Sequence, residues 1–123
     1  MSLSIQDVIE YLAKVCDDKK ATDIRIYDVQ HYSPYVDFVV FCSVKNNIHL
    51  SAIAQELSSE YKKNLVGKIS DDFYDFPHIS GSSDSGWIAV DCNACVFHVM
   101  TEEMRELYGL DAIYAKRGSV FYF

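Results

Sequence analysis

Two cysteines, Cys92 and Cys95, stand in the C-x-x-C spacing that thiol redox proteins and zinc sites use. In redox proteins a helix N-terminus stabilises the first thiolate of such a pair. Here Asn93 and Ala94 join two β-rich runs, so the pattern predicts a hairpin turn without helix amides. Zinc would need two more ligands, for which the chain offers only scattered histidines and cysteines. We interpret Cys92 and Cys95 as buried, unpaired thiols, with a redox or zinc role as the alternative.

Asp37, Asp91 and His98 are polar residues set within otherwise apolar predicted strands. Such groups need partners when buried, and they concentrate at functional sites. Asp37 and Asp91 could hold Mg²⁺ for nucleotidyl transfer, but that chemistry uses carboxylates two residues apart and a glycine-rich turn that cradles phosphate. Residues 43–46 contain no glycine, and no predicted strand carries the paired carboxylates. We therefore predict no catalytic, metal or cofactor site, with a residual Mg-dependent nucleotidyltransferase or nucleotide-binding protein as the alternative.

Trp87 is the single tryptophan, and it follows a polar, glycine-containing stretch. Trp, Tyr and Arg often dominate binding energy at protein interfaces, where truncation of one costs roughly 2 kcal/mol or more. Arg105 and Tyr108 lie three residues apart on a predicted helix, so they would share one face and extend such a patch. Trp87 is thus either a core residue or the anchor of a protein interface.

Three segments show apolar residues at helical spacing, and each begins at a capping residue. The first covers about residues 4–18, beginning at Ser4. The second covers about residues 46–65, beginning at Asn46 or Asn47. The third begins at Thr101 and stops at Gly109, and a further turn follows it.

Four segments read as strands, and they cover about residues 23–29, 36–42, 87–92 and 95–100. We assign residues 66–86 to a short edge strand at 68–70 followed by a mobile loop. Helices with one apolar stripe must cover a sheet, so the fold class is α/β of the α+β type, with a mixed sheet of about five strands flanked by helices. One domain is expected over residues 1–123, with its core at about 4–114 and a tail at 115–123.

Charge and composition limit the function classes. The chain has 123 residues and a formal charge of −7, so its average surface repels phosphate, and sequence-specific nucleic-acid binding is not expected. A basic protein partner suits this charge better. The N-terminal apolar residues are interrupted by Asp7 and Glu10, so we predict neither a signal peptide nor a membrane span, and a cytoplasmic protein.

Short motifs along most of the chain, roughly residues 19–114, resemble the ribosome-silencing factors, also called the Iojap-like family. The matching residues are Lys20-Ala21-Thr22-Asp23-Ile24, Asp28-Val29, Ser33, Asp37-Phe38-Val39-Val40, Ile53-Ala54, Gly81, Trp87, Asp91, His98-Val99-Met100 and Arg105-Glu106-Leu107-Tyr108-Gly109-Leu110-Asp111. The chain departs from the family pattern in residues 43–48 and at Ala94.

The resemblance implies a nucleotidyltransferase-like fold that lacks the catalytic residues. It also implies binding to the large ribosomal subunit through ribosomal protein L-fourteen, which keeps the small subunit from joining and represses translation. The partner-binding positions carried over are Trp87, Asp91, His98, Met100, Arg105 and Tyr108. No cofactor is expected, and a homodimer is compatible with the family and with an exposed edge strand.

Overall fold

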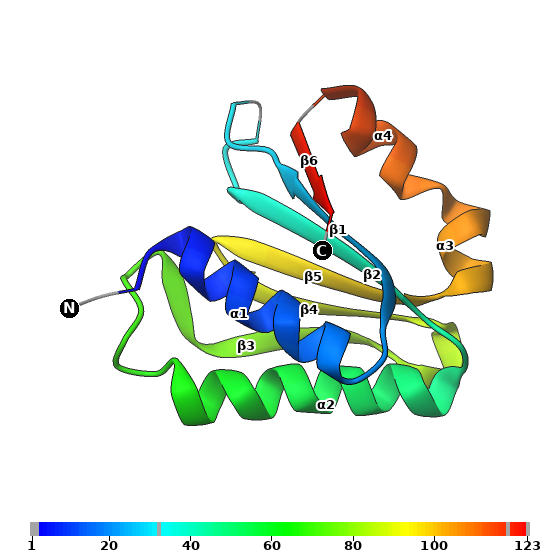
Figure 1. The fold of residues 1–123 in the computed structure, drawn as a ribbon, viewed down its shortest axis with the longest axis horizontal. Coiled ribbons are helices and arrows are strands. Elements are labelled where there is room, and N and C mark those ends of the chain that lie inside the picture. The colour runs from blue at the N-terminus through cyan, green and yellow to red at the C-terminus, as the bar shows by residue number, and fades with distance from the viewer. Residues whose placement is uncertain (1–2, 32, 118, 123) are drawn as a thin grey trace.

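The structure, a computed structural model, describes residues 3–31, 33–117 and 119–122. Within these residues a six-stranded mixed sheet carries two helices on each face (Figure 1). The elements in chain order are α1 (Ile5–Asp18), β1 (Thr22–Asp28), β2 (Phe38–Val44), α2 (Asn47–Asn64), β3 (Phe73–Ser82), the 3₁₀ helix η1 (Ser83–Ser85), β4 (Trp87–Asn93), β5 (Cys95–Thr101), α3 (Glu102–Tyr108), α4 (Leu110–Arg117) and β6 (Ser119–Tyr122). The predicted mixed sheet flanked by helices is confirmed.

The strands lie in the order β3-β4-β5-β2-β1-β6. Neighbouring strands are antiparallel except β2 and β5, which run parallel in the centre with Val40 opposite Phe97. This central position explains the nearly unbroken apolar run of β2, because both of its faces are covered. The predicted hairpin joins β4 to β5 at Asn93, whose φ of 79° is one that asparagine tolerates.

Two clusters of buried side chains hold the helices on the sheet. The larger cluster lies under α1 and α2 and contains all four cysteines, which are buried and free. The smaller cluster lies on the other face, where Tyr27, Phe41 and Met100 pack against Met104 of α3 and against residues of α4. Free buried thiols were predicted, and this prediction is confirmed.

The predicted helix caps are confirmed. Ser4 Oγ accepts from the Asp7 backbone N–H at 3.0 Å, and the Asp7 carboxylate accepts in turn from the Ser4 backbone N–H. Asn46 Oδ1 accepts from the His49 N–H at 2.8 Å. Thr101 Oγ1 accepts from the Met104 N–H at 3.3 Å, so local chemistry places the starts of α1, α2 and α3.

The expectation for residues 66–86 is wrong. Strand β3 covers Phe73–Ser82 and pairs with β4, for example Ile79 with Val90, and η1 follows it. Long-range pairing with β4 satisfies the backbone hydrogen-bonding groups of this segment, while the buried Phe73 anchors its start. Pro77 is compatible with β3 because the strand lies at the edge of the sheet.

The end of the chain also differs from the prediction of a tail after residue 114. Helix α4 continues to Arg117, and residues 119–122 form β6, which pairs with β1. Position 118 and position 123, also assigned to the tail, lie outside the described residues. In the described chain no helix has the length and apolar character needed to cross a membrane.

Candidate partner-binding surface

One face of β4 and β5 is only partly covered by helices. Side chains alternate across a strand, and every second residue of β4, beginning with Trp87, is half-buried. In the register of the hairpin, Ala89 lies opposite His98 and Asp91 lies opposite Val96, so these half-buried residues share the face. Tyr108, at the end of α3, stands beside them with 52% of its surface exposed. We call Trp87, Asp91, His98 and Tyr108 the open surface.

Aromatic contacts connect the open surface to the core. The ring of Tyr108 lies 5.2 Å from that of Trp87, and Trp87 lies 5.6 Å from the imidazole of His98. His98 in turn stacks on the buried Phe41 at 5.0 Å. The exposed Tyr108 is therefore supported, through Trp87 and His98, by a side chain packed in the core.

A hydrogen bond determines which ring nitrogen of neutral His98 carries the proton. The indole N–H of Trp87, which can only donate, lies 3.0 Å from Nδ1 of His98, so Nδ1 accepts and the neutral ring carries its proton on Nε2. Burial lowers the pKa of His98 to about 4. Near neutral pH the open surface thus includes a neutral imidazole, and no described residue accepts from its Nε2.

Asp91 supplies a carboxylate to the same face. Its Oδ1 accepts from the backbone N–H of Asn93 at 2.9 Å, a local bond that stabilises the turn of the hairpin. The side chain is half-buried, so it combines a structural bond with partial access to solvent.

Two of the six predicted partner-binding residues are buried. Met100 has no exposed surface and packs beneath Trp87 and Met104, while Arg105 is 8% exposed. The expected shared face of Arg105 and Tyr108 is therefore not found, because Arg105 turns inward as Tyr108 turns outward. Met100 therefore lies beneath the open surface, while Arg105 lines a hollow beside α3.

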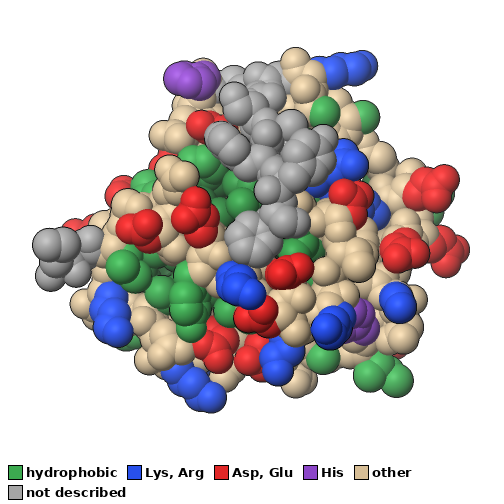
Figure 2. All heavy atoms as spheres, in the orientation of Figure 1, with side chains coloured by type: hydrophobic (Ala, Val, Ile, Leu, Met, Phe, Trp, Pro, Cys, Tyr) green, Lys and Arg blue, Asp and Glu red, His purple; other side chains and the backbone are tan. Residues whose placement is uncertain are grey.

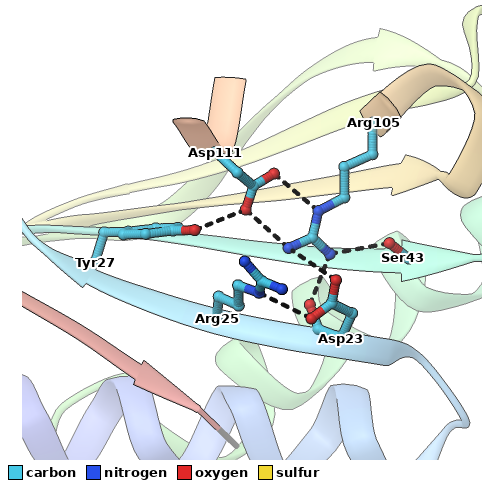
Figure 3. A network of polar contacts seen from close by, with 6 residues as sticks. All are labelled: Asp23, Arg25, Tyr27, Ser43, Arg105 and Asp111. Carbon is cyan, nitrogen blue, oxygen red and sulfur yellow. Dashed lines mark hydrogen bonds and ion pairs between the residues drawn. The ribbon is translucent and has the colours of Figure 1, made fainter. Parts of the chain in front are cut away.

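The guanidinium of Arg105 lies in a polar network between α3, α4 and the sheet (Figure 3). Its Nε and Nη2 each donate to one oxygen of Asp111 at 2.9 Å. Its Nη1 donates to Ser43 Oγ at 2.9 Å and to the carbonyl of Asp23 at 2.6 Å. The hydroxyl of Tyr27 donates to Asp111 at 2.9 Å. Burial raises the pKa of Asp111, but the bonds from Arg105 and Tyr27 outweigh it and hold that pKa below its usual value.

Sequence reasoning missed the roles of Tyr27 and Phe41 in supporting the open surface. Both lie in predicted strands, where alternation indicates burial but not which helix residue they meet. Only one local signal pointed to the network. Arg105 and Asp111 flank Gly109, a helix-ending residue, so a turn there could bring opposite charges together.

A hollow of about 460 Å³ lies beside the Arg105 network. Its lining includes two ion pairs, Arg105 with Asp111 and Arg25 with Asp23, the latter at 2.9 Å. Glu102 and Glu106 also line the hollow, so its four carboxylates outnumber its two guanidinium groups. A lining with this net negative charge disfavours an anionic ligand.

No metal centre is found in the described ranges, which contain no group of three or more His, Cys, Asp or Glu side chains able to hold an ion. Asp37 and Asp91, considered above as a Mg²⁺ pair, have no third ligand of this kind beside them within that part of the chain.

Comparison with known protein families identifies the chain. A family model described as "Ribosomal silencing factor during starvation" matches residues 2–120. The chain belongs to the ribosomal silencing factor family. The resemblance seen in the sequence is thereby confirmed, and membership of this family supports a role in translation regulation.

Related proteins agree with this assignment. The chain is 29% identical to the ribosomal silencing factor of Haemophilus influenzae over 108 residues, which cover 88% of this chain and 98% of the relative. It is 30% identical to the mouse protein named mitochondrial assembly of ribosomal large subunit protein 1, over 89% of this chain and 46% of the relative. A crystal structure of a Chromobacterium violaceum protein shares the fold, with a TM-score of 0.79 at 21% identity over 92% of this chain and 88% of the other.

Proposed function

We propose that this silencing factor binds the large ribosomal subunit in the cytoplasm, through ribosomal protein L-fourteen, and prevents the small subunit from joining. Family membership supports the silencing role, and the name of the mouse relative supports an association with the large subunit. The observation that carries the proposal is the open surface, where Trp87, His98 and Tyr108 form a supported aromatic patch.

The open surface has the composition of a protein interface. Half-buried or exposed Trp and Tyr side chains supply apolar area at low entropic cost, and they are the residues most enriched among energetic anchors. The Nε2–H of His98 offers a donor, and the carboxylate of Asp91 offers an acceptor. We assign direct contact to the four residues of the open surface, and a supporting role to Met100 and Arg105.

Charge favours a basic partner. Helix α3 carries Glu102, Glu103 and Glu106, all exposed, and Figure 2 shows acidic side chains gathered along the edge where α3 lies. Acidic side chains at this edge speed the encounter with a positively charged protein and disfavour docking on bare RNA. An interface of about 1,600 Å² is enough for specific binding.

The proposed mechanism needs no chemistry or cofactor. A protein bound at the site that the other subunit must cover excludes that subunit, and the degree of inhibition follows the occupancy of the site. A saturating amount of the silencing factor should therefore abolish joining without altering either subunit.

Co-sedimentation with isolated ribosomal subunits tests binding. We expect the protein to pellet with large subunits and to remain in solution with small subunits. It should also remain in solution when the large subunits lack L-fourteen. Light scattering during subunit joining then tests silencing. Equal pelleting with both subunits, or normal joining at saturation, contradicts the proposal.

A further inference from the structure

We infer that Arg105 and Asp111 are positioning residues, whose ion pair holds the elbow between α3 and α4 and thereby keeps Tyr108 and Trp87 in binding geometry. The elbow is the segment Tyr108–Gly109–Leu110. The consequence for binding rests on the proposed function, whereas the effect on Trp87 can be measured on the protein alone.

The elbow needs an external restraint. Gly109 ends α3 in the left-handed conformation, with φ 59° and ψ 29°, and α4 begins at the next residue. Two backbone bonds close this turn, from the Gly109 N–H to the Arg105 carbonyl at 3.0 Å and from the Ala112 N–H to the Gly109 carbonyl at 3.2 Å, and neither of them joins the elbow to the sheet. Arg105 precedes the elbow and Asp111 follows it, so their two parallel 2.9 Å bonds join the last turn of α3 to the first turn of α4.

The pair is also tied to the sheet. Nη1 of Arg105 reaches Ser43 of β2 and the backbone of Asp23 in β1, and Asp111 accepts from Tyr27 of β1. Figure 3 shows Ser43, Asp23 and Asp111 around the guanidinium, with Tyr27 pointing to Asp111. The bonds fix where the elbow sits on the sheet as well as its internal angle.

The restraint reaches the open surface through a closed series of contacts. The guanidinium of Arg105 lies 5.8 Å from the ring centre of Phe41, and Phe41 stacks on His98. His98 accepts from Trp87, and Trp87 contacts Tyr108. Tyr108 is three residues after Arg105 on α3, which closes the series. A shift of the elbow therefore changes the surroundings of Trp87.

Positioning explains why a buried charge is kept here. A buried ion pair adds little net stability compared with well-packed apolar residues, but it accepts only a narrow geometry. Arginine suits this role better than lysine because its planar fork matches a carboxylate. An interface whose aromatic residues are already ordered loses less entropy on binding.

Fluorescence of Trp87, the single tryptophan, reports on the inference without a partner. We expect Asp111→Asn and Arg105→Lys to shift the emission to longer wavelength and to increase quenching by acrylamide, with far-ultraviolet circular dichroism showing the fold intact. Tyr27→Phe removes one bond to Asp111 and provides a milder variant, with a smaller shift in the same direction. Emission like that of the wild type in all three variants overturns the inference.

Glu60→Gln is the matched control. It disturbs a tyrosine–carboxylate bond of 2.6 Å between Tyr11 and Glu60, which joins α1 to α2 on the other side of the sheet. It should leave the Trp87 emission unchanged. An equal shift in Glu60→Gln would show that any loosening of the fold is sufficient, and would overturn the inference.

Binding to large subunits tests the consequence. We expect Asp111→Asn to raise the dissociation rate about 10-fold, since the variant must order its aromatic residues on binding, while Glu60→Gln stays within about twofold. Wild-type affinity in a variant whose Trp87 emission has shifted overturns the inference. If the wild-type protein itself does not bind, the proposed function fails, and the emission alone decides whether Arg105 and Asp111 hold Trp87.

Discussion

The indole N–H of Trp87 donates to Nδ1 of His98 across 3.0 Å, and this bond joins β4 to β5 at the centre of the open surface. The two residues are not directly opposite in the hairpin, because His98 is paired with Ala89. The bond is therefore a diagonal one, and it requires a His98 that is unprotonated at Nδ1. Protonation of His98 at Nδ1 would therefore break this bond, which links both the stability of the fold and the geometry of the open surface to the pH.

We predict that His98 makes the protein less stable as the pH falls from about 6.5 to about 4. Burial places the pKa of folded His98 at about 4, below its ordinary value of 6.5, so the unfolded chain takes up the proton first. The stabilisation is present above pH 6.5 and is lost as the pH drops, by at most about 3 kcal/mol. Urea unfolding at a series of pH values measures it.

The control is His98→Asn, whose amide oxygen can accept near the position of Nδ1 but does not titrate. Other carboxylates lose stabilisation in acid in both proteins, so the difference between the two curves isolates His98. Parallel curves between pH 6.5 and 4 would show that His98 keeps an ordinary pKa in the folded protein.

A second prediction concerns the anchors. Truncation of an interface aromatic typically costs about 2 kcal/mol, so Trp87→Ala and Tyr108→Ala should each weaken binding to large subunits about 30-fold. Tyr35→Ala is the matched control, since Tyr35 is 85% exposed, precedes β2 and is not one of the four residues of the open surface. Equal losses for Tyr35 and Tyr108 would point to an interface elsewhere. Each variant must first be shown to fold.

Local signals in the sequence predicted most of the fold. Ser4, Asn46 and Thr101 begin helices because their side chains bond to amides within the next three residues, which sequence alone reveals. Strand β3 was missed because Pro77 interrupts it and the Ser/Gly-rich stretch from Ser80 resembles a loop, while its pairing with β4 arises from tertiary structure. Strand β6 was also missed because it depends on tertiary structure: it pairs with β1, about 90 residues earlier in the chain.

The open surface was partly predictable from residue types. Trp87, Asp91 and His98 stand out as polar or bulky residues in apolar strands, so their types alone marked them. The inward turn of Arg105 was not visible, because an arginine on an amphipathic helix is usually exposed. Arg105 turns inward because its partners lie there: Asp111 beyond the elbow, and Ser43 and the Asp23 carbonyl in the sheet.

The cysteines provide a third prediction. A hydrogen bond with the Cys92 thiol, together with burial, holds the pKa of Cys95 well above its usual value, and a bond with Cys42 acts in the same direction on Cys16. Thiolate is the reactive form, so Ellman's reagent should not react with the native protein within minutes, and four thiols should react in guanidinium. Rapid reaction of two thiols in the native protein would restore a redox role for Cys92 and Cys95.

The last prediction tests how closely β3 supports Trp87. Gly81 has a φ of 91°, and a Cβ at this position would collide with the carbonyl oxygen of Trp87 and lie 3.3 Å from Cα of Ile88. Gly81→Ala therefore combines backbone strain with a steric clash, and we expect it to lower the free energy of unfolding by about 3 kcal/mol. Urea unfolding measures the loss, and Trp87 emission should shift as the backbone moves.

Gly67→Ala separates the two causes. Gly67 has a similar φ of 82°, but an added Cβ would meet nothing within 4 Å. The variant should lose only about 1 kcal/mol, from the backbone conformation, and keep the emission of the wild type. If the two alanine variants were equally stable, strain in φ would account for both, and the close approach of β3 to the Trp87 backbone would not contribute. A larger loss for Gly81→Ala, with shifted emission, would show that the edge strand also positions the open surface.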